Sequence, residues 1–251
     1  MSERERERED RPHVAVFRPD DERLATARSL LEELGADPVA DPMLAVEPTG
    51  DRPVDADYVV FTSKTGAELV ADDWEPGTAT VVAIGPKTAD ALEAAGYAVD
   101  LVPEEFSSTG LVEALADRAA GATVEVARSD HGSPVLLDGL RDAGATVDET
   151  VLYRLVRPAG SGHSTEAAAA GDLDAACFTS SLTVEHFLEA AAKRGVRDAA
   201  VRGLNAAVVG VIGDPTRETA ASHGIDVDVV ATEATFETLA RETVAALDAD
   251  R

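Results

Sequence analysis

Two glycine-containing segments, GPKT and GDPT, each follow a short apolar run and begin a helical pattern. Gly85, Lys87 and Thr88 lie in the first segment, and Gly213 and Thr216 lie in the second. The N–H groups of a helix N-terminus attract carboxylate and phosphate groups. Neither segment has the GxxxxGK[ST] or GxGxxG pattern of a nucleotide-binding loop. Two interpretations stay open: an anion site, or glycines that end strands and threonines that satisfy free helix N–H groups.

Two further segments, FTSK and FTSS, end other apolar runs with clustered hydroxyl groups. Only three lysines occur, and Lys64 and Lys87 stand in two of these four loops, which favours an anion-binding role. The structural alternative is a capping box formed by Thr65 and Glu68. The candidate ligand-binding residues of these segments are Thr62, Ser63, Lys64, Thr179, Ser180 and Ser181.

Arg18 and Arg128 occupy equivalent strand ends, and Ser129 follows the second. Arginine can clamp a carboxylate with two hydrogen bonds, although a solvated arginine is an equal alternative. Cys177 is the only cysteine, which excludes an intramolecular disulfide, and its apolar neighbours indicate burial rather than a nucleophile. The histidines are scattered without a metal-binding motif, so we expect no metal.

The chain has 251 residues and a formal charge of −26, from 22 basic and 48 acidic residues. Such acidity is typical of proteins from a salt-saturated cytoplasm, where carboxylates keep the surface hydrated. A nucleic-acid partner is disfavoured because phosphate binding needs a basic face. No apolar run approaches the ~20 residues of a membrane helix, and no signal peptide is evident, so we expect a cytoplasmic protein. The charged residues 1–11 are expected to be disordered.

Short apolar runs alternate with helical patterns, which predicts an α/β fold with parallel sheets and helices on both faces. Leu24, Ala27, Leu30, Leu31 and Leu34 share one helix face, and a glycine follows as a stop. The segment 157–164, RPAGSGHS, is expected to be a flexible linker. The predicted strands are 14–17, 58–61, 80–84, 99–102, 124–127, 175–178, 207–212 and 227–230.

An internal repeat organises these elements. The segment 84–111 matches 212–239 without a gap, VVFTSKTGAE matches ACFTSSLTVE, and VAVFRPD matches VEVARSD. The chain therefore contains two copies of one α/β unit, with a simple division near residue 120. Two facing copies would line a cleft with helix N-termini, which suits a ligand with several carboxylates.

The ordered set of VVFTSKTGAE, AIGPKTADALEAAGYAVDLVPEEFSSTGLVEAL, ARSDHGSPVLLDGLRDAGATVDETVLYRLVRP, ACFTSS and VIGDPTRETAASHGIDVDVVATEATFETLA resembles the uroporphyrinogen-III synthase family. The resemblance runs from about Val14 to Leu247. One departure is Asp214, where the family more often has proline, and its charge would weaken carboxylate binding by that loop. The resemblance implies two α/β domains joined by a two-stranded connector, with the active site in the cleft. The expected domains are 1–40 with 158–251, and 41–157, so the first βα unit would pack with the C-terminal half.

The resemblance also implies a reaction. Hydroxymethylbilane, a linear tetrapyrrole with eight carboxylates, would be cyclised with inversion of ring D and loss of water, through an azafulvene cation and a spiro intermediate. No cofactor is implied, and we expect a monomer whose partner is this small molecule. Tyr153 is the implied general acid, since a phenol keeps its proton at neutral pH, and Thr88 would orient the substrate. The alternatives are a catalytically silent module that binds a tetrapyrrole or another polycarboxylate, and a two-domain solute-binding protein, which would normally carry a secretion signal.

Overall fold

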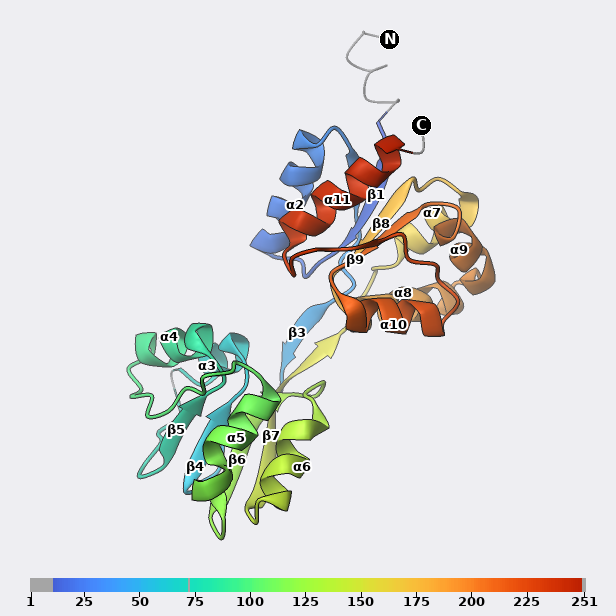
Figure 1. The fold of residues 1–251 in the computed structure, drawn as a ribbon. Helices are drawn as coiled ribbons and strands as arrows, with labels where there is room; N and C mark the ends of the chain where they lie inside the picture. The colour runs from blue at the N-terminus through green and yellow to red at the C-terminus, as the bar shows by residue number, and fades with distance from the viewer. Residues whose placement is uncertain (1–10, 72, 250–251) are drawn as a thin grey trace. The chain divides into compact units, whose positions relative to one another are not determined.

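The computed structural model describes residues 11–71 and 73–249, and within them the chain forms two compact α/β units (Figure 1). Unit 1 combines residues up to Ala45 with residues from Val156 onward, and unit 2 comprises Val46–Leu155. Each unit has a five-stranded sheet within the described residues. The predicted α/β class with parallel sheets is confirmed. The expected disorder of the acidic tail falls on residues outside the described range, apart from the exposed Arg11.

The sheet of unit 1 has the strand order β10-β9-β8-β1-β2, and each neighbouring pair is parallel. The first βα unit of the chain is therefore built into a sheet with strands from the C-terminal half. The elements of unit 1 are β1 His13–Phe17, α2 Glu22–Glu33, β2 Asp37–Ala40, α7 His163–Ala170, β8 Ala175–Phe178, α8 Ser181–Lys193, α9 Arg197–Leu204, β9 Val208–Val211, α10 Asp214–Ser222, β10 Val229–Val230 and α11 Phe236–Ala249.

The sheet of unit 2 has the order β3-β7-β6-β4-β5, and its pairs β7-β6, β6-β4 and β4-β5 are parallel. Strand β3 lies beside β7 and begins at the boundary between the units. The elements are β3 Ala45–Pro48, β4 Tyr58–Phe61, α3 Lys64–Leu69, β5 Thr80–Ala83, α4 Pro86–Ala94, α5 Ser108–Ala119, β6 Thr123–Ser129, α6 Pro134–Asp142 and β7 Thr146–Val156.

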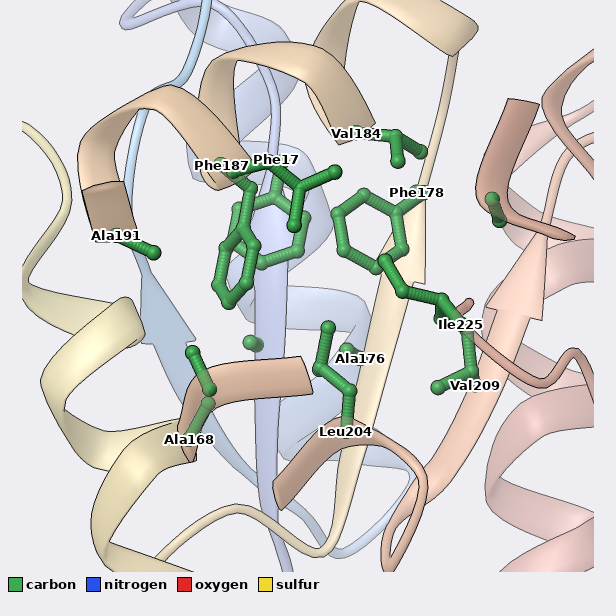
Figure 2. Close-up of a cluster of buried hydrophobic side chains, with 14 of the residues drawn as sticks. Phe17, Ala168, Ala176, Phe178, Val184, Phe187, Ala191, Leu204, Val209 and Ile225 are labelled. Atoms are coloured by element: carbon green, nitrogen blue, oxygen red, sulfur yellow. The ribbon is translucent and has the colours of Figure 1, made fainter. Parts of the chain in front are cut away.

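Successive side chains of a strand point to opposite faces, so each apolar run supplies two separate cores. In β1, Val14 and Val16 face α2 and α11, whereas Ala15 and Phe17 face the opposite layer of α7, α8, α9 and α10. The second core contains three buried aromatic rings (Figure 2): Phe17 stacks on Phe178 with centroids 4.6 Å apart, and Phe187 meets both edge-on. Unit 2 repeats this arrangement, with α3 and α4 on one face and α5 and α6 on the other.

Several predicted elements need correction. The segment 99–102 is not a strand, because only Leu101 forms an isolated bridge to Val82. The strand predicted at 227–230 shortens to β10. Strands β2 and β3 were not predicted, because each contains a proline and neither has an apolar run. In α2, by contrast, Leu24, Ala27 and Leu31 are buried as predicted, and a left-handed Gly35 follows the helix.

The prediction of a flexible linker at 157–164 is wrong, because the second half of this segment is buried and tied down. The carboxylate of Asp41, which is fully buried, accepts hydrogen bonds from the N–H groups of Gly162 (2.7 Å) and Ser164 (2.9 Å). Gly162 has a φ of 104°, a conformation that favours glycine. Asp41 therefore fixes the start of α7 in unit 1.

Candidate functional site

The hydroxyl and basic residues singled out in the sequence lie at the carboxyl ends of strands. In unit 2 they follow β4 and β5 and end β6, and Tyr153 lies near the end of β7. In unit 1 they follow β1, β8 and β9. Because neighbouring strands are parallel, these residues share one edge of their own sheet. This is the edge at which open α/β sheets bind ligands.

A tyrosine–serine pair forms the best-defined part of the edge in unit 2. The side chain of Tyr153 is buried, with 6% of the residue exposed, and its hydroxyl donates a hydrogen bond to Oγ of Ser63 over 3.0 Å. Ser63 also accepts the N–H of Gly66 at 3.0 Å and is the N-cap of α3. The serine therefore has two roles: it starts the helix and it orients the phenol.

A glycine makes room for this pair. A Cβ atom at Gly66 would lie 3.1 Å from Oγ of Ser63 and 3.2 Å from Cδ1 of Leu152. It would also come within 4.0 Å of the Tyr153 ring. The bare backbone of Gly66 lets the first turn of α3 approach β7 closely enough for the hydrogen bond to form.

The capping box predicted from Thr65 and Glu68 is wrong. Helix α3 begins at Lys64, two residues earlier than that motif requires, and Ser63 caps it. Glu68 instead forms an exposed ion pair with Lys64, with N–O separation of 3.1 Å. Lys87 is exposed in the first turn of α4, and no ion pair or hydrogen bond of its side chain is recorded among the described residues. Lys87 is thus available to an anion, whereas Lys64 is already partly neutralised.

Arg128 has a structural role that accounts for its position. Its side chain is buried, and its Nε donates to Glu149 at 2.6 Å. Its Nη1 donates to the carbonyl oxygen of Ser133 at 2.6 Å. Ser129 is half-buried, and its Oγ accepts a long bond from the N–H of His131. Contact of Arg128 with a ligand stays a prediction for which the observed bonds give no support.

The two glycine loops have the same geometry. Gly85 and Gly213 are the N-caps of α4 and α10, both with extended backbones and without a side-chain cap. Thr88 and Thr216 are 4% and 2% exposed, so both threonine side chains are buried in these loops. In the second loop Asp214 pairs with Arg217 at 2.9 Å, which offsets part of its negative charge.

The hydroxyl groups after β8 hold unit 1 together. Thr179 donates to the carbonyl oxygen of Phe17 at 3.0 Å, which ties the end of β8 to the end of β1. Ser180 forms a reciprocal capping box with Thr183 at the start of α8. Ser181 donates to the carbonyl oxygen of Pro215 at 3.0 Å. Thr62, at the equivalent position of unit 2, is half-buried.

The cysteine of the chain is not placed to act as a nucleophile. Cys177 is fully buried in β8, and burial raises the pKa of its thiol to about 12, so the prediction that it is a packing residue is confirmed. Among residues 11–71 and 73–249, no three histidine, cysteine or acidic side chains gather in a way that could hold a metal ion. Over the same range, no helix is both long and apolar enough to cross a membrane.

Sequence reasoning missed two residues of this edge. Gly66 was read only as part of a capping pattern, and Glu149 was not recognised as the partner of Arg128. Glu149 lies 21 residues from Arg128, and strand pairing brings the two together. Only a prediction that β6 and β7 are neighbours could have found this ion pair.

Comparison with known proteins identifies the family. The family model "Uroporphyrinogen-III synthase HemD" matches residues 25–241. A protein of Methanothermobacter thermautotrophicus, named as a candidate uroporphyrinogen-III synthase, is 31% identical over 84% of this chain and 90% of its own length. The uroporphyrinogen-III synthase of Synechococcus elongatus is 27% identical over 74% of this chain and 73% of its own.

Solved structures support the fold. A mutant uroporphyrinogen III synthase of Thermus thermophilus aligns with a TM-score of 0.66 and 22% identity, covering 95% of this chain and 99% of that one. The uroporphyrinogen-III synthetase of Helicobacter pylori aligns with a TM-score of 0.61 and 15% identity, covering 94% and 99%. The fold and the strand-end residues define a two-unit α/β protein. The chain belongs to the uroporphyrinogen-III synthase family, whose members are cyclising lyases of tetrapyrrole biosynthesis.

Proposed function

We propose that this chain cyclises hydroxymethylbilane to uroporphyrinogen III, with inversion of ring D and loss of water. Membership of the family supports the reaction. The observation that carries the chemistry is the Tyr153 phenol held 3.0 Å from the Ser63 hydroxyl at the carboxyl edge of the unit 2 sheet. Tyr153 is the proton donor in this proposal, and Ser63 is a positioning residue.

The first step is the loss of the substrate hydroxyl group. Tyr153 transfers its proton to the oxygen of the leaving hydroxyl group. The carbon–oxygen bond breaks, the oxygen keeps the bonding electron pair and leaves as water, and an azafulvene cation remains. A serine hydroxyl can donate as well as accept, so Ser63 can turn its own hydrogen toward the phenolate that remains. The later ring closure through a spiro intermediate releases a proton, which restores the phenol.

The second task is to hold one folded conformation of the substrate, because the free chain closes to the non-inverted isomer. Positioning of this kind can supply roughly 7–11 kcal/mol. We propose that Lys64, Lys87 and the uncapped first turns after Gly85 and Gly213 contact the substrate carboxylates. Both first turns lack a side-chain cap. The N–H groups of Thr88 and Thr216 already bond to the carbonyl oxygens of Gly85 and Gly213. The N–H groups of Lys87 and Asp214 are therefore those left for an anion.

The composition also supports a proposal about the cellular setting. A charge of −26 on 251 residues suits a protein that works as a monomer in a salt-rich cytoplasm. Sedimentation in potassium chloride solution would measure the mass, with about 26 kDa expected and a dimer mass contradicting the monomer.

Product analysis tests the proposed reaction. Freshly prepared hydroxymethylbilane is supplied to the purified protein in molar potassium chloride, and the product isomers are separated. Isomer III in excess over the control without enzyme is the expected result. Isomer I alone, from protein that circular dichroism shows to be folded in that salt, would contradict the proposal and favour a silent binding module.

A further inference from the structure

A pocket of about 540 Å³ lies in unit 1 and is lined by residues of α2 and α11. These two helices cover the same face of the sheet (Figure 1). Its volume falls within the range of about 300–1,000 Å³ that is usual for small-molecule sites. Arg18 and Phe236 stand at one end, where β1 finishes and α11 begins. Ala27 and Leu30 supply apolar wall from α2.

Arg18 is the arginine of this pocket that could bind an anionic ligand. Its Nε is buried, and no hydrogen-bond or ion-pair partner is recorded for its side chain among the described residues. Its guanidinium lies over the Phe236 ring, 5.1 Å from the ring centroid. Loss of water around the guanidinium and the nearby charge of Arg23 lower the pKa of Arg18, while the charge of Asp21 acts in the opposite direction.

The other two arginines of the pocket are already paired. Arg23 is bound by Asp21 in a close ion pair at 2.5 Å, and Arg241 is bound by Glu237 at 3.0 Å. The remaining pocket carboxylates, on Glu22 and Glu33, are exposed along α2. Within residues 11–71 and 73–249, therefore, no carboxylate forms an ion pair or a hydrogen bond with Arg18, and Asp21 is paired with Arg23 instead.

The internal repeat allows Arg18 to be compared with its counterpart in unit 2, which has a carboxylate partner. Arg128 occupies the position in unit 2 that Arg18 occupies in unit 1. There the Glu149 carboxylate binds the guanidinium Nε at 2.6 Å. In unit 1 the Nε of Arg18 is buried with no such partner, and a pocket lies beside it. A buried N–H group without a partner costs free energy, which a ligand carboxylate would recover.

We propose that the α2–α11 pocket binds a carboxylated pyrrole ring, with its carboxylate on Arg18 as Glu149 is on Arg128. The choice of a pyrrole rests on the proposed function, whose substrate carries carboxylates on pyrrole rings. Phe236, Ala27 and Leu30 supply the apolar surface that a flat ring requires. The pocket would hold one ring of the tetrapyrrole through its carboxylate arm.

Calorimetric titration with a monopyrrole that carries one acetate and one propionate group tests this inference. Arg18→Gln removes the charge, and the matched control Arg28→Gln removes the same charge from an exposed position of α2 outside this pocket. Thr26→Trp, at an exposed pocket position, fills the space without touching Arg18. Circular dichroism first establishes that each variant is folded in the titration buffer.

The expected result is saturable binding to the wild type, at least tenfold weaker binding to Arg18→Gln and Thr26→Trp, and a change of less than twofold in Arg28→Gln. Equal binding by the wild type and both pocket variants would overturn the inference. The absence of saturable binding to the wild type at millimolar ligand would also overturn the inference. If that wild-type protein still forms isomer III, the proposed function stands. Arg18-dependent binding by a protein that forms only isomer I would support the pocket and refute the proposed function.

Discussion

Tyr153 and Ser63 are 90 residues apart in the chain, and their hydrogen bond is the contact on which the proposed chemistry depends. We expect Tyr153→Phe to lower turnover by roughly 10²-fold or more, since general acid catalysis typically contributes 10²–10⁴-fold. The fold should survive, because one neutral hydrogen bond contributes only about 0.5–1.5 kcal/mol. Steady-state kinetics and urea unfolding of the same preparation measure the two effects.

Tyr97→Phe is the matched control. The Tyr97 hydroxyl donates to the carbonyl oxygens of Val70 and Trp74, both at 2.8 Å, within the core of unit 2. Its loss should reduce the free energy of unfolding while the turnover of folded enzyme stays near that of the wild type. Unchanged turnover in Tyr153→Phe would remove this tyrosine from the mechanism.

Glu125 gives a pH dependence that is separate from catalysis. This residue of β6 is 1% exposed, and neither carboxylate oxygen meets hydrogen-bond geometry with a described residue. Burial raises the pKa of Glu125, and Asp148 and Glu149 raise it further, while the Thr150 hydroxyl acts in the opposite direction. The folded state therefore binds more protons than the unfolded state between the two pKa values, and this carboxyl group makes stability fall as pH rises through that interval.

Glu125→Gln removes the charge, so we expect its free energy of unfolding to exceed that of the wild type at neutral pH by on the order of 1 kcal/mol. The difference should shrink as pH falls toward the ordinary pKa of a glutamate. Urea unfolding at a series of pH values measures it, with the exposed Glu113→Gln as a control that should leave stability nearly unchanged. A wild-type advantage at neutral pH would show that the buried carboxylate stabilises the fold.

The approach of α3 to β7 depends on one glycine. In Gly66→Ala the new methyl group would lie 3.1 Å from Oγ of Ser63 and 3.2 Å from Cδ1 of Leu152, so these side chains, which adjoin Tyr153, must give way by a few tenths of an ångström. We expect a loss of about 1–3 kcal/mol in unfolding free energy, typical of overpacking, together with reduced turnover.

Gly139→Ala provides the comparison. It overpacks α6 against Val112, with a contact of 2.6 Å, on the opposite face of the same sheet. It should lower stability and leave the turnover of folded enzyme unchanged. Equal turnover losses in the two variants would indicate a general effect of instability rather than displacement of the tyrosine–serine pair.

The strands that the sequence predicted well are those with β-branched apolar runs, such as Tyr58–Phe61 and Val208–Val211, because both faces of these strands are buried. The run at 99–102 looked similar, but only Leu101 pairs with the sheet. The long strand β7 is absent from the list of predicted strands, because its first half contains exposed acidic residues between half-buried ones. Local patterns therefore reveal strands with continuous apolar runs and miss strands that contain proline or exposed acidic residues, as β2, β3 and β7 do.

The candidate site was predictable only in part for a related reason. Parallel strands place their carboxyl ends at one edge, so the pattern of strand-end hydroxyl groups was sufficient to find that edge. The partners at the edge depend on strand order, which the sequence did not reveal. Ser63 with Tyr153, and Arg128 with Glu149, are pairs of this kind.

Across the whole chain, the charge of −26 predicts a dependence on salt. Self-repulsion of carboxylates opposes the compact state, and salt shortens its range from a Debye length of about 10 Å at 0.1 M to about 3 Å at 1 M. We expect the free energy of unfolding to rise between 0.1 M and 2 M potassium chloride. Urea titrations at each salt concentration measure it, and a flat or falling curve would contradict the proposed salt-rich setting.

The repeat makes the two halves alike in fold, yet their strand-end arginines differ. Arg128 forms an ion pair with Glu149 in unit 2. Arg18 lines a pocket of unit 1, and its Nε has no hydrogen-bond partner among the described residues. Duplication thus supplied two similar sheets, and side-chain changes gave them different surfaces. The substrate carries eight carboxylates, and an arginine without an ion-pair partner is the kind of group that binds a carboxylate.

The most direct test of the account is the ratio of isomer III to isomer I formed from hydroxymethylbilane as the enzyme concentration is raised. Spontaneous closure to isomer I competes at a fixed rate, so a synthase should shift the product progressively toward isomer III. The account predicts that the wild type reaches nearly pure isomer III and that Tyr153→Phe needs roughly 10²-fold more protein to do so. A ratio that stays at the value without enzyme, at every concentration of folded protein, would contradict it.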